Sequence, residues 1–218
     1  MLTIAEEVYL LFLDDQHGAI IDTPVPVIAQ VLAGALLMEL TLGDYVEAEI
    51  DTLRLAGGQD AGEPLLDEAL RELRRTPDPQ PIAACLQELA RPQRALPERV
   101  LARLLERGIL RREERRLFWV LAVRQYPLVD DREVREVKTR LRALIMSDDL
   151  PDPRDVVLIS LASSARLFDT MFTPAERIRL QSRIDLLARF DLVGQVVARS
   201  VRSIEQTMTQ LLALAAAM

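Results

Sequence analysis

The chain has 218 residues, of which half are apolar and only 4% are aromatic, and its net charge at neutral pH is −7. This length predicts a single compact domain, and packing that relies on leucine and alanine favours helices over a β-sandwich. The overall acidity argues against bulk nucleic-acid binding, because a net negative field repels phosphate. A single cysteine excludes an intrachain disulfide, and without a recognisable secretory signal we expect a cytoplasmic location.

The first part of the chain predicts two helices followed by strand. Thr3 and Glu6 have the spacing of a capping box, in which each side chain accepts a hydrogen bond from the other residue's backbone N–H, so a helix begins here. A second helix is expected from about Pro26 to Leu42. Its apolar run is too short to cross a bilayer and predicts a buried core helix. Residues 45–55 alternate apolar and polar side chains, which is typical of a short strand.

The rest of the chain predicts helices separated by prolines, glycines and polar turns. The expected helices cover residues 63–75, 82–90, 97–107, 131–146, 154–167, 174–190 and 192–217. Thr173 and Glu176 form a second capping box. The last helix ends in LLALAAAM, which predicts that it docks on the body or on another subunit. Residues 109–110 and 117–123 flank a charged stretch and predict the two arms of a β-hairpin with a charged tip.

Few residues suit catalysis or metal binding. His17 is the only histidine, and at a helix end it predicts a cap or an exposed side chain. Cys85 lies on an apolar helix face and predicts a buried thiol. The carboxylate pairs 6–7, 14–15 and 148–149 fall at helix termini or on exposed faces, where acidic residues complement the helix dipole. We therefore predict a protein that is not an enzyme and that needs no cofactor or metal.

One basic segment stands out against the acidic whole. Between Arg91 and Arg116 there are nine arginines and four glutamates, a net charge of +5. A charge run is usually a solvated face with local ion pairs to glutamate. The alternative is an anion-binding surface, which arginine without lysine favours because guanidinium matches phosphate with two prongs. The residues assigned to this surface, which we expect to converge, are Arg91, Arg94, Arg99, Arg111 and Arg112.

The predicted hairpin brings the only tryptophan next to this arginine-rich segment. In a two-stranded ribbon, Phe118 and Trp119 point to opposite faces, so that one can fill the core while the other stays outside. Together with Arg115 and Arg116, they predict a contact with a lipid headgroup layer or with another subunit.

Several collinear stretches resemble the Golgi phosphoprotein 3 family. LTIAEEVYLLFLDDQHG resembles its opening helix, and GEPLLDEALREL resembles its most specific segment, G-D-x-L-L-D-E-A-L. LLERGILRREERR resembles its hairpin region, and DPRDVVLISLASSARLFDTMF resembles a late helix. The resemblance covers nearly the whole chain and implies a mainly helical, non-enzymatic single domain with a few short strands and a protruding β-hairpin. The arginine-, alanine- and leucine-rich composition is typical of bacterial-looking relatives.

The resemblance also implies partners. Its eukaryotic members are peripheral membrane adaptors that bind phosphatidylinositol 4-phosphate and the cytoplasmic tails of membrane proteins, and their hairpin is implicated in self-association. The family's headgroup residues, one tryptophan and three arginines, align near Pro24, Ala33, Arg94 and Pro97, and Arg94 alone has the family's residue type. The resemblance therefore implies looser electrostatic binding to anionic lipid, at about 1 kcal/mol per basic residue near the surface.

Three functions follow from these patterns. The first is a peripheral membrane adaptor that binds anionic headgroups and a membrane-protein client. The second is a soluble homo-oligomeric scaffold assembled through the hairpin. The third, which the acidic remainder of the chain disfavours, is a winged-helix nucleic-acid module formed by residues 96–121.

Overall fold

The structure, a computed structural model, describes residues 2–14, 18–117, 121–125, 132–189 and 191–216. Its helices are α1 (Ile4–Leu11), α2 (Val25–Leu42), α3 (Pro64–Leu73), α4 (Ile82–Leu89), the 3-10 helix η1 (Pro92–Arg94), α5 (Leu96–Glu106), α6 (Arg132–Met146), α7 (Pro153–Ser164), α8 (Phe168–Met171), α9 (Pro174–Ala188) and α10 (Leu192–Ala216). Its strands are β1 (Val46–Glu49), β2 (Thr52–Leu55), β3 (Gln80–Pro81), β4 (Glu113–Leu117) and β5 (Leu121–Gln125). The predicted mainly helical fold with short strands and a hairpin is confirmed.

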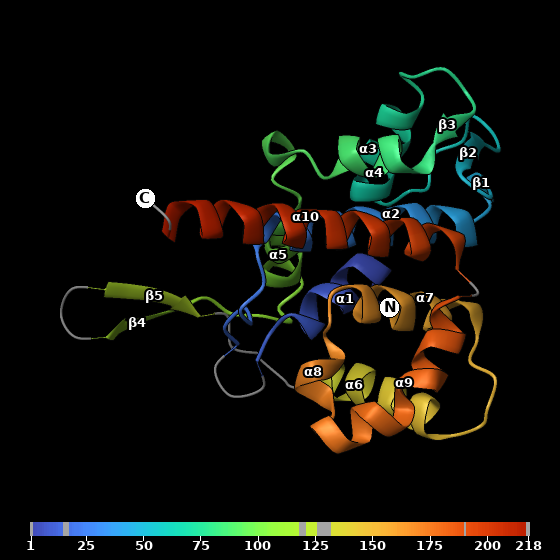
Figure 1. Ribbon diagram of the computed structural model, residues 1–218. Coiled ribbons are helices and arrows are strands. Elements are labelled where there is room, and N and C mark those ends of the chain that lie inside the picture. Colours follow the sequence, from blue (N-terminus) through green and yellow to red (C-terminus); the bar gives the residue numbers. More distant parts are fainter. Residues whose placement is uncertain (1, 15–17, 118–120, 126–131, 190, 217–218) are drawn as a thin grey trace.

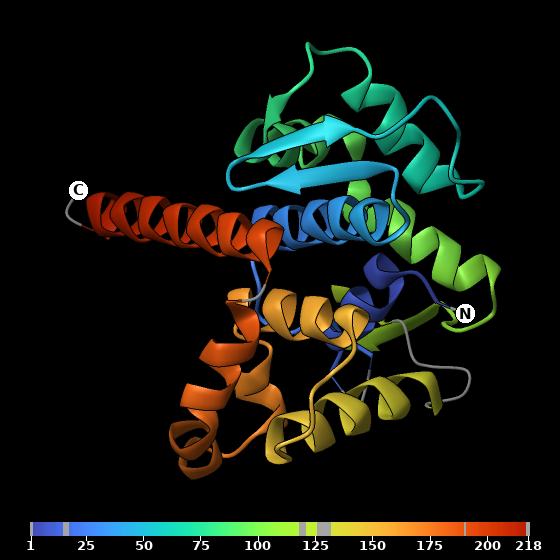
Figure 2. The ribbon, with the colours of Figure 1, turned by 90° about the vertical axis from the view of Figure 1, so that its right-hand side faces the viewer.

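Helix α2 lies at the centre of the core. It packs against α1, α7 and α10 as well as α3, α4 and α5, so most of its side chains are removed from water. By length and composition alone its 18 residues would also suit a membrane span, but 72% of that stretch is buried inside the protein. The expectation of a buried core helix is therefore confirmed. Figure 2 shows α2 and α10 as a middle layer, with the small sheet, α3 and α4 on one side and α1, α6, α7 and α9 on the other.

The local signals at helix starts act as expected. The Glu6 backbone N–H donates to the Thr3 hydroxyl, and the Thr3 backbone N–H donates to the Glu6 carboxylate, which completes the capping box of α1. Thr173 and Glu176 make the same reciprocal pair at α9. The alternating residues 45–55 form the antiparallel pair β1–β2, in register from Val46 opposite Leu55 to Glu49 opposite Thr52, and β3 extends this sheet.

The hairpin differs from its predicted boundaries. Gly108 adopts a left-handed φ of 68°, and the Ile109 N–H donates to the Leu104 carbonyl while the Gly108 N–H donates to that of Leu105. This is a Schellman cap, in which the apolar residue after the glycine packs back on the helix. Ile109 and Leu110 are accordingly buried and do not form an arm of the hairpin. The arms are β4 and β5, so the charged residues 113–116 lie in a strand and not at the tip.

Helix α10 docks through its first half. Val193, Val197 and Val201 are buried against the body, and α10 packs on both α2 and α7. Further along, Leu211 is 60% exposed, and Figure 1 shows this part of α10 extending past α5. The predicted docking of this helix is confirmed, and it is made by the buried valines of the first half of α10. The prediction relied on the apolar C-terminal stretch of the chain, but Leu211 in that stretch is exposed and does not contribute to the docking.

Candidate functional site

Arg94, the residue that the family resemblance singles out, is surrounded by carboxylates. Its Nη2 lies 2.8 Å from Glu72 and 2.5 Å from Glu88, its Nη1 lies 3.9 Å from Glu68, and its Nε donates to the Glu88 carbonyl at 2.8 Å. The Arg94 side chain is only 19% exposed. Its hydrogen bond lowers the pKa of the Glu72 carboxyl, and the same bond raises the pKa of Arg94. Arg94 therefore links α3 to α4 through η1.

The cavity that Arg94 itself lines is too small for a headgroup. The cavity that Arg94 lines together with Arg99 measures about 10 Å³, roughly the room of one water molecule. Two further positions of the family's headgroup pocket are closed as well, because Ala33 is fully buried in α2 and Pro97 is buried in the first turn of α5. The Arg94 region is consequently a structural ion-pair cluster, and a phosphate would have to displace its carboxylates.

The arginines of α5 also point at carboxylates. Arg99 donates with two nitrogens to Glu68, at 2.7 and 2.5 Å. Arg103 Nη2 lies 2.7 Å from Glu63, the N-cap of α3, and Arg107 Nη1 lies 2.5 Å from the buried carboxylate of Glu6 in α1. The spacing of four does place the three arginines on one face, but that face is an interface with α3 and α1. The recognition face that a winged-helix module needs is thus occupied.

The remaining predicted arginines lie at opposite ends of α5. Arg91 precedes it, is 63% exposed and pairs with Glu88 at 2.8 Å. Arg111 and Arg112 follow it and are exposed. An eleven-residue helix is about 16 Å long, so these groups do not converge on one pocket as expected. Arg115 and Arg116 belong to β4, opposite Val123 and Ala122, whereas Phe118 and Trp119 lie outside the described residues.

A polar groove that the sequence analysis did not predict lies where α7, α9 and α10 meet. It encloses about 550 Å³ and is lined by four arginines, two acidic residues and three serines. The charged residues are Arg166, Asp185, Arg189, Arg199, Arg202 and Glu205. The signal in the sequence was the pair Arg199 and Arg202, three residues apart on one helix face. Nothing local indicated that the ends of α7 and α9 would bring Arg166 and Arg189 to the same place.

Comparison with known families identifies the chain. Residues 4–208 match the family described as Golgi phosphoprotein 3 (GPP34). The chain belongs to the Golgi phosphoprotein 3 family. This is a family of non-enzymatic adaptors, peripheral on membranes or cytosolic, so the prediction that the chain is not an enzyme is confirmed. The resemblance inferred from the sequence is confirmed over nearly its whole length.

In this Golgi phosphoprotein 3 family member, the surroundings of the reactive side chains do not favour catalysis or metal binding. Burial raises the pKa of the Cys85 thiol to about 11, so the thiol stays protonated at neutral pH. Within the described residues, no three His, Cys, Asp or Glu side chains are grouped to hold a metal ion. His17 lies outside those residues.

The carboxylate pair Glu6 and Glu7 lies at a helix terminus, as expected, but has a further role. Glu6 and Glu7 do lie in the first turn of α1, but they are 0% and 6% exposed. Arginines from α5, α6 and α7 pair with them, so they join the N-terminal helix to the body. The capping box predicts the role of Glu6 at the start of the helix. It does not predict the arginines, distant in the sequence, that pair with Glu6 and Glu7.

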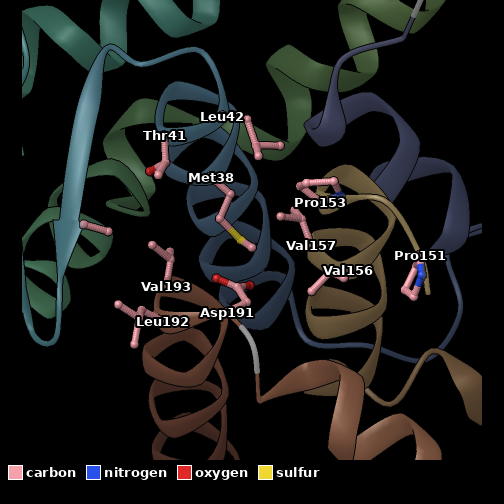
Figure 3. Close-up of a pocket in the computed structure, with 11 residues that line it drawn as sticks. Met38, Thr41, Leu42, Pro151, Pro153, Val156, Val157, Asp191, Leu192 and Val193 are labelled. Carbon is pink, nitrogen blue, oxygen red and sulfur yellow. The ribbon is translucent and has the colours of Figure 1, made fainter.

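A second, apolar pocket lies on the other side of the start of α10. It has a volume of about 430 Å³, and Met38, Val156 and Val193 contribute to its lining together with the Asp191 carboxylate, which faces Met38 in Figure 3. Burial raises the pKa of Asp191 to about 6, while hydrogen bonds with the Gly194 N–H and the Ser160 hydroxyl oppose that rise. Asp191 immediately precedes α10, where its hydrogen bonds cap the helix.

Proposed function

We propose that this protein is a non-enzymatic peripheral membrane adaptor that binds anionic phospholipid headgroups and presents another face to a membrane-protein client. The observation that carries the proposal is the family match over residues 4–208, since the family consists of adaptors of this kind. The chain acts as one domain in the cytoplasm, on the inner face of a membrane, and needs no cofactor.

We expect headgroup binding to be electrostatic, without selectivity for phosphatidylinositol 4-phosphate. Arg94 and Arg99 are held in ion pairs, and their cavity of about 10 Å³ has no room for an inositol phosphate. The membrane contact falls instead to the exposed Arg111 and Arg112 and to the hairpin that follows, with Arg115, Arg116, Phe118 and Trp119. Arg91 contributes from the other end of α5. Each basic residue near an anionic surface contributes about 1 kcal/mol, so several are needed for stable binding.

Co-sedimentation with vesicles tests this proposal. Wild-type protein is expected to bind vesicles that contain phosphatidylserine and to be released by added salt. The double substitution Arg111→Glu and Arg112→Glu should abolish the binding. The matched control, Arg54→Glu with Arg71→Glu, reverses two exposed arginines elsewhere and should retain most of it. Binding that ignores both the anionic lipid fraction and the salt concentration would overturn the proposal.

A second candidate, which can hold together with the first, is self-association through the hairpin. The supporting observation is that β4 and β5 pair only with each other among the described strands and extend away from the helices in Figure 1. The free edges of such a ribbon can pair with another copy of the chain. Light scattering on the wild type and on Trp119→Ala tests this. A larger mass that falls in the variant supports assembly, and a monomeric wild type contradicts it.

A further inference from the structure

We propose that the groove between α7, α9 and α10 binds a phosphomonoester, either as a free small molecule or as the headgroup of a lipid. The inference goes beyond the proposed function, because it assigns a defined ligand site to a face that the hairpin contact does not use. It also differs in position from the family's headgroup pocket, which aligns with Arg94.

Within the part of the chain that the structure describes, two arginines of this groove, the α7–α9–α10 groove, have no carboxylate partner. Arg189 directly follows α9 and Arg202 lies on α10; both are exposed, and neither forms a salt bridge with a described residue. This contrasts with Arg94, which three carboxylates surround at 19% exposure. Two guanidinium groups that line one concave surface and form no salt bridge with a described carboxylate are suited to an external anion.

The other two arginines are only loosely engaged. Arg166 Nη2 lies 3.2 Å from Glu205, and Arg199 Nη2 lies 3.4 Å from Asp51. Both arginines and both of their carboxylate partners are at least 35% exposed, so each ion pair contributes little to stability. A ligand can therefore replace either carboxylate at low cost.

The charge and the shape of the groove select the ligand class. Four arginines against Asp185 and Glu205 give the lining a net charge of +2, although the whole chain carries −7. Asp185 already accepts a hydrogen bond from Gln181 at 2.8 Å. Three serines also line the wall; the Ser160 hydroxyl bonds to Asp191 and the Ser164 hydroxyl donates to the Leu161 carbonyl. A doubly charged phosphate has three terminal oxygens, one more than a carboxylate, and a larger negative charge, so it suits a surface that carries several guanidinium groups. The volume of about 550 Å³ also falls within the usual range of small-molecule sites.

The backbone conformation of Arg166 makes a sharper test of the groove possible. Arg166 follows the C-terminus of α7 with a φ of +56°, in the left-handed region. A helix that ends this way usually has glycine at this position, because a side chain there is strained. The side chain of Arg166 lines the groove. The substitution Arg166→Gly therefore separates structure from function, since it relieves the strain and removes the guanidinium group.

Binding is tested first with a soluble ligand, glycerol 3-phosphate, titrated by calorimetry at low salt. We expect saturable binding by wild-type protein. Arg189→Gln, Arg202→Gln and Arg166→Gly should each weaken the affinity by about tenfold or more, because each removes a charged hydrogen-bond donor. Arg166→Gly should keep or raise the melting temperature. Arg179→Gln, an exposed arginine of α9 outside the groove, is the matched control and should bind like the wild type.

Vesicles identify the source of the phosphate. Phosphatidic acid carries a terminal phosphomonoester and phosphatidylserine does not, so they are compared in otherwise equal phosphatidylcholine vesicles. If the wild type prefers phosphatidic acid and the groove variants lose this preference, the site binds a lipid headgroup. If the wild type binds glycerol 3-phosphate without that preference, the site binds a free ligand. Neither binding nor preference in the wild type, or equal binding by wild type and groove variants, overturns the inference. Variants with Arg111 and Arg112 reversed fail only in the vesicle assay, so loss of the proposed membrane contact is distinguishable from loss of the groove.

Discussion

The Nη2 atom of Arg154 lies 2.8 Å from Oε2 of Glu7, which is 147 residues earlier in the chain. Arg140 Nη2 approaches the other oxygen of the same carboxylate at 2.9 Å. Arg154 also reaches Glu39 at 3.4 Å, and Arg140 reaches Asp155 at 2.8 Å. Because Glu7 is 6% exposed, this network holds α1 against α6 and α7 with little competition from water.

Removing the shared carboxylate should destabilise the fold strongly. Glu7→Ala leaves Arg140 and Arg154 with one partner fewer in a poorly hydrated place. We expect a loss of about 3 kcal/mol in the free energy of unfolding, at the lower end of the cost of breaking a buried pair because both arginines keep another carboxylate. Urea denaturation measures it. Glu47→Ala, an exposed glutamate of β1, should change the free energy by less than about 0.5 kcal/mol, and equal losses in the two variants would contradict this role of Glu7.

Arg94 should behave as a structural residue and not as a headgroup ligand. Arg94→Gln removes the partner of Glu72 and Glu88 and should lower the free energy of unfolding by about 2 kcal/mol. The pKa of Glu72 is lowered in the folded protein, so its contribution is present above the unfolded value near 4.5 and is lost as the pH falls. The effect of Arg94→Gln should therefore shrink in acid. Vesicle binding by the folded variant should equal that of the wild type, and a selective loss of lipid binding at unchanged stability would show the opposite role.

Local sequence signals predicted most of the helices. Thr3 with Glu6 and Thr173 with Glu176 fix two helix starts, because a capping box depends on residues three apart. The hairpin was misplaced because Ile109 has the apolar character of a strand residue. Ile109 is instead the buried residue of a Schellman cap, which requires a left-handed conformation at Gly108. The alternation of apolar and polar residues does not predict that conformation.

The electrostatics were much less predictable. The spacing of Arg99, Arg103 and Arg107 correctly placed them on one helix face, but their partners come from α3 and α1, as far as 101 residues away. A sequence shows neighbours three and four residues apart and not which helix will pack against them. For the same reason the sequence does not predict the α7–α9–α10 groove, which is assembled from the ends of separate helices.

Asp191 should give the stability of the protein a distinct pH dependence. Its pKa is raised from 3.8 to about 6 by burial, so the folded state binds a proton more tightly than the unfolded state. The stability that this proton contributes is full below about pH 4 and is lost as the pH rises through about 6. Asp191→Asn keeps the shape without the charge. Its stability relative to the wild type should rise between about pH 4 and pH 7 in urea denaturation. Asp22→Asn, at an exposed position, is the control variant, and a profile for Asp191→Asn that runs parallel to that of the wild type would refute the burial effect.

The close approach of α10 to α2 depends on the missing side chain of Gly34. A Cβ atom there would lie 2.5 Å from Cγ2 of Val197, closer than packed atoms tolerate, and 3.1 Å from Cδ2 of Leu161, which is a tight contact. Gly34→Ala should therefore cost about 1–3 kcal/mol despite its better helix propensity, because the core would be overpacked. Val197→Ala removes the clashing methyl groups, so the double variant should lose less stability than the two single losses combined, by about 1 kcal/mol. Gly57→Ala, where a Cβ meets no atom within 4 Å, should be nearly neutral. Strictly additive losses in urea denaturation would mean that the two residues do not meet, and that α10 does not dock on α2 at this point.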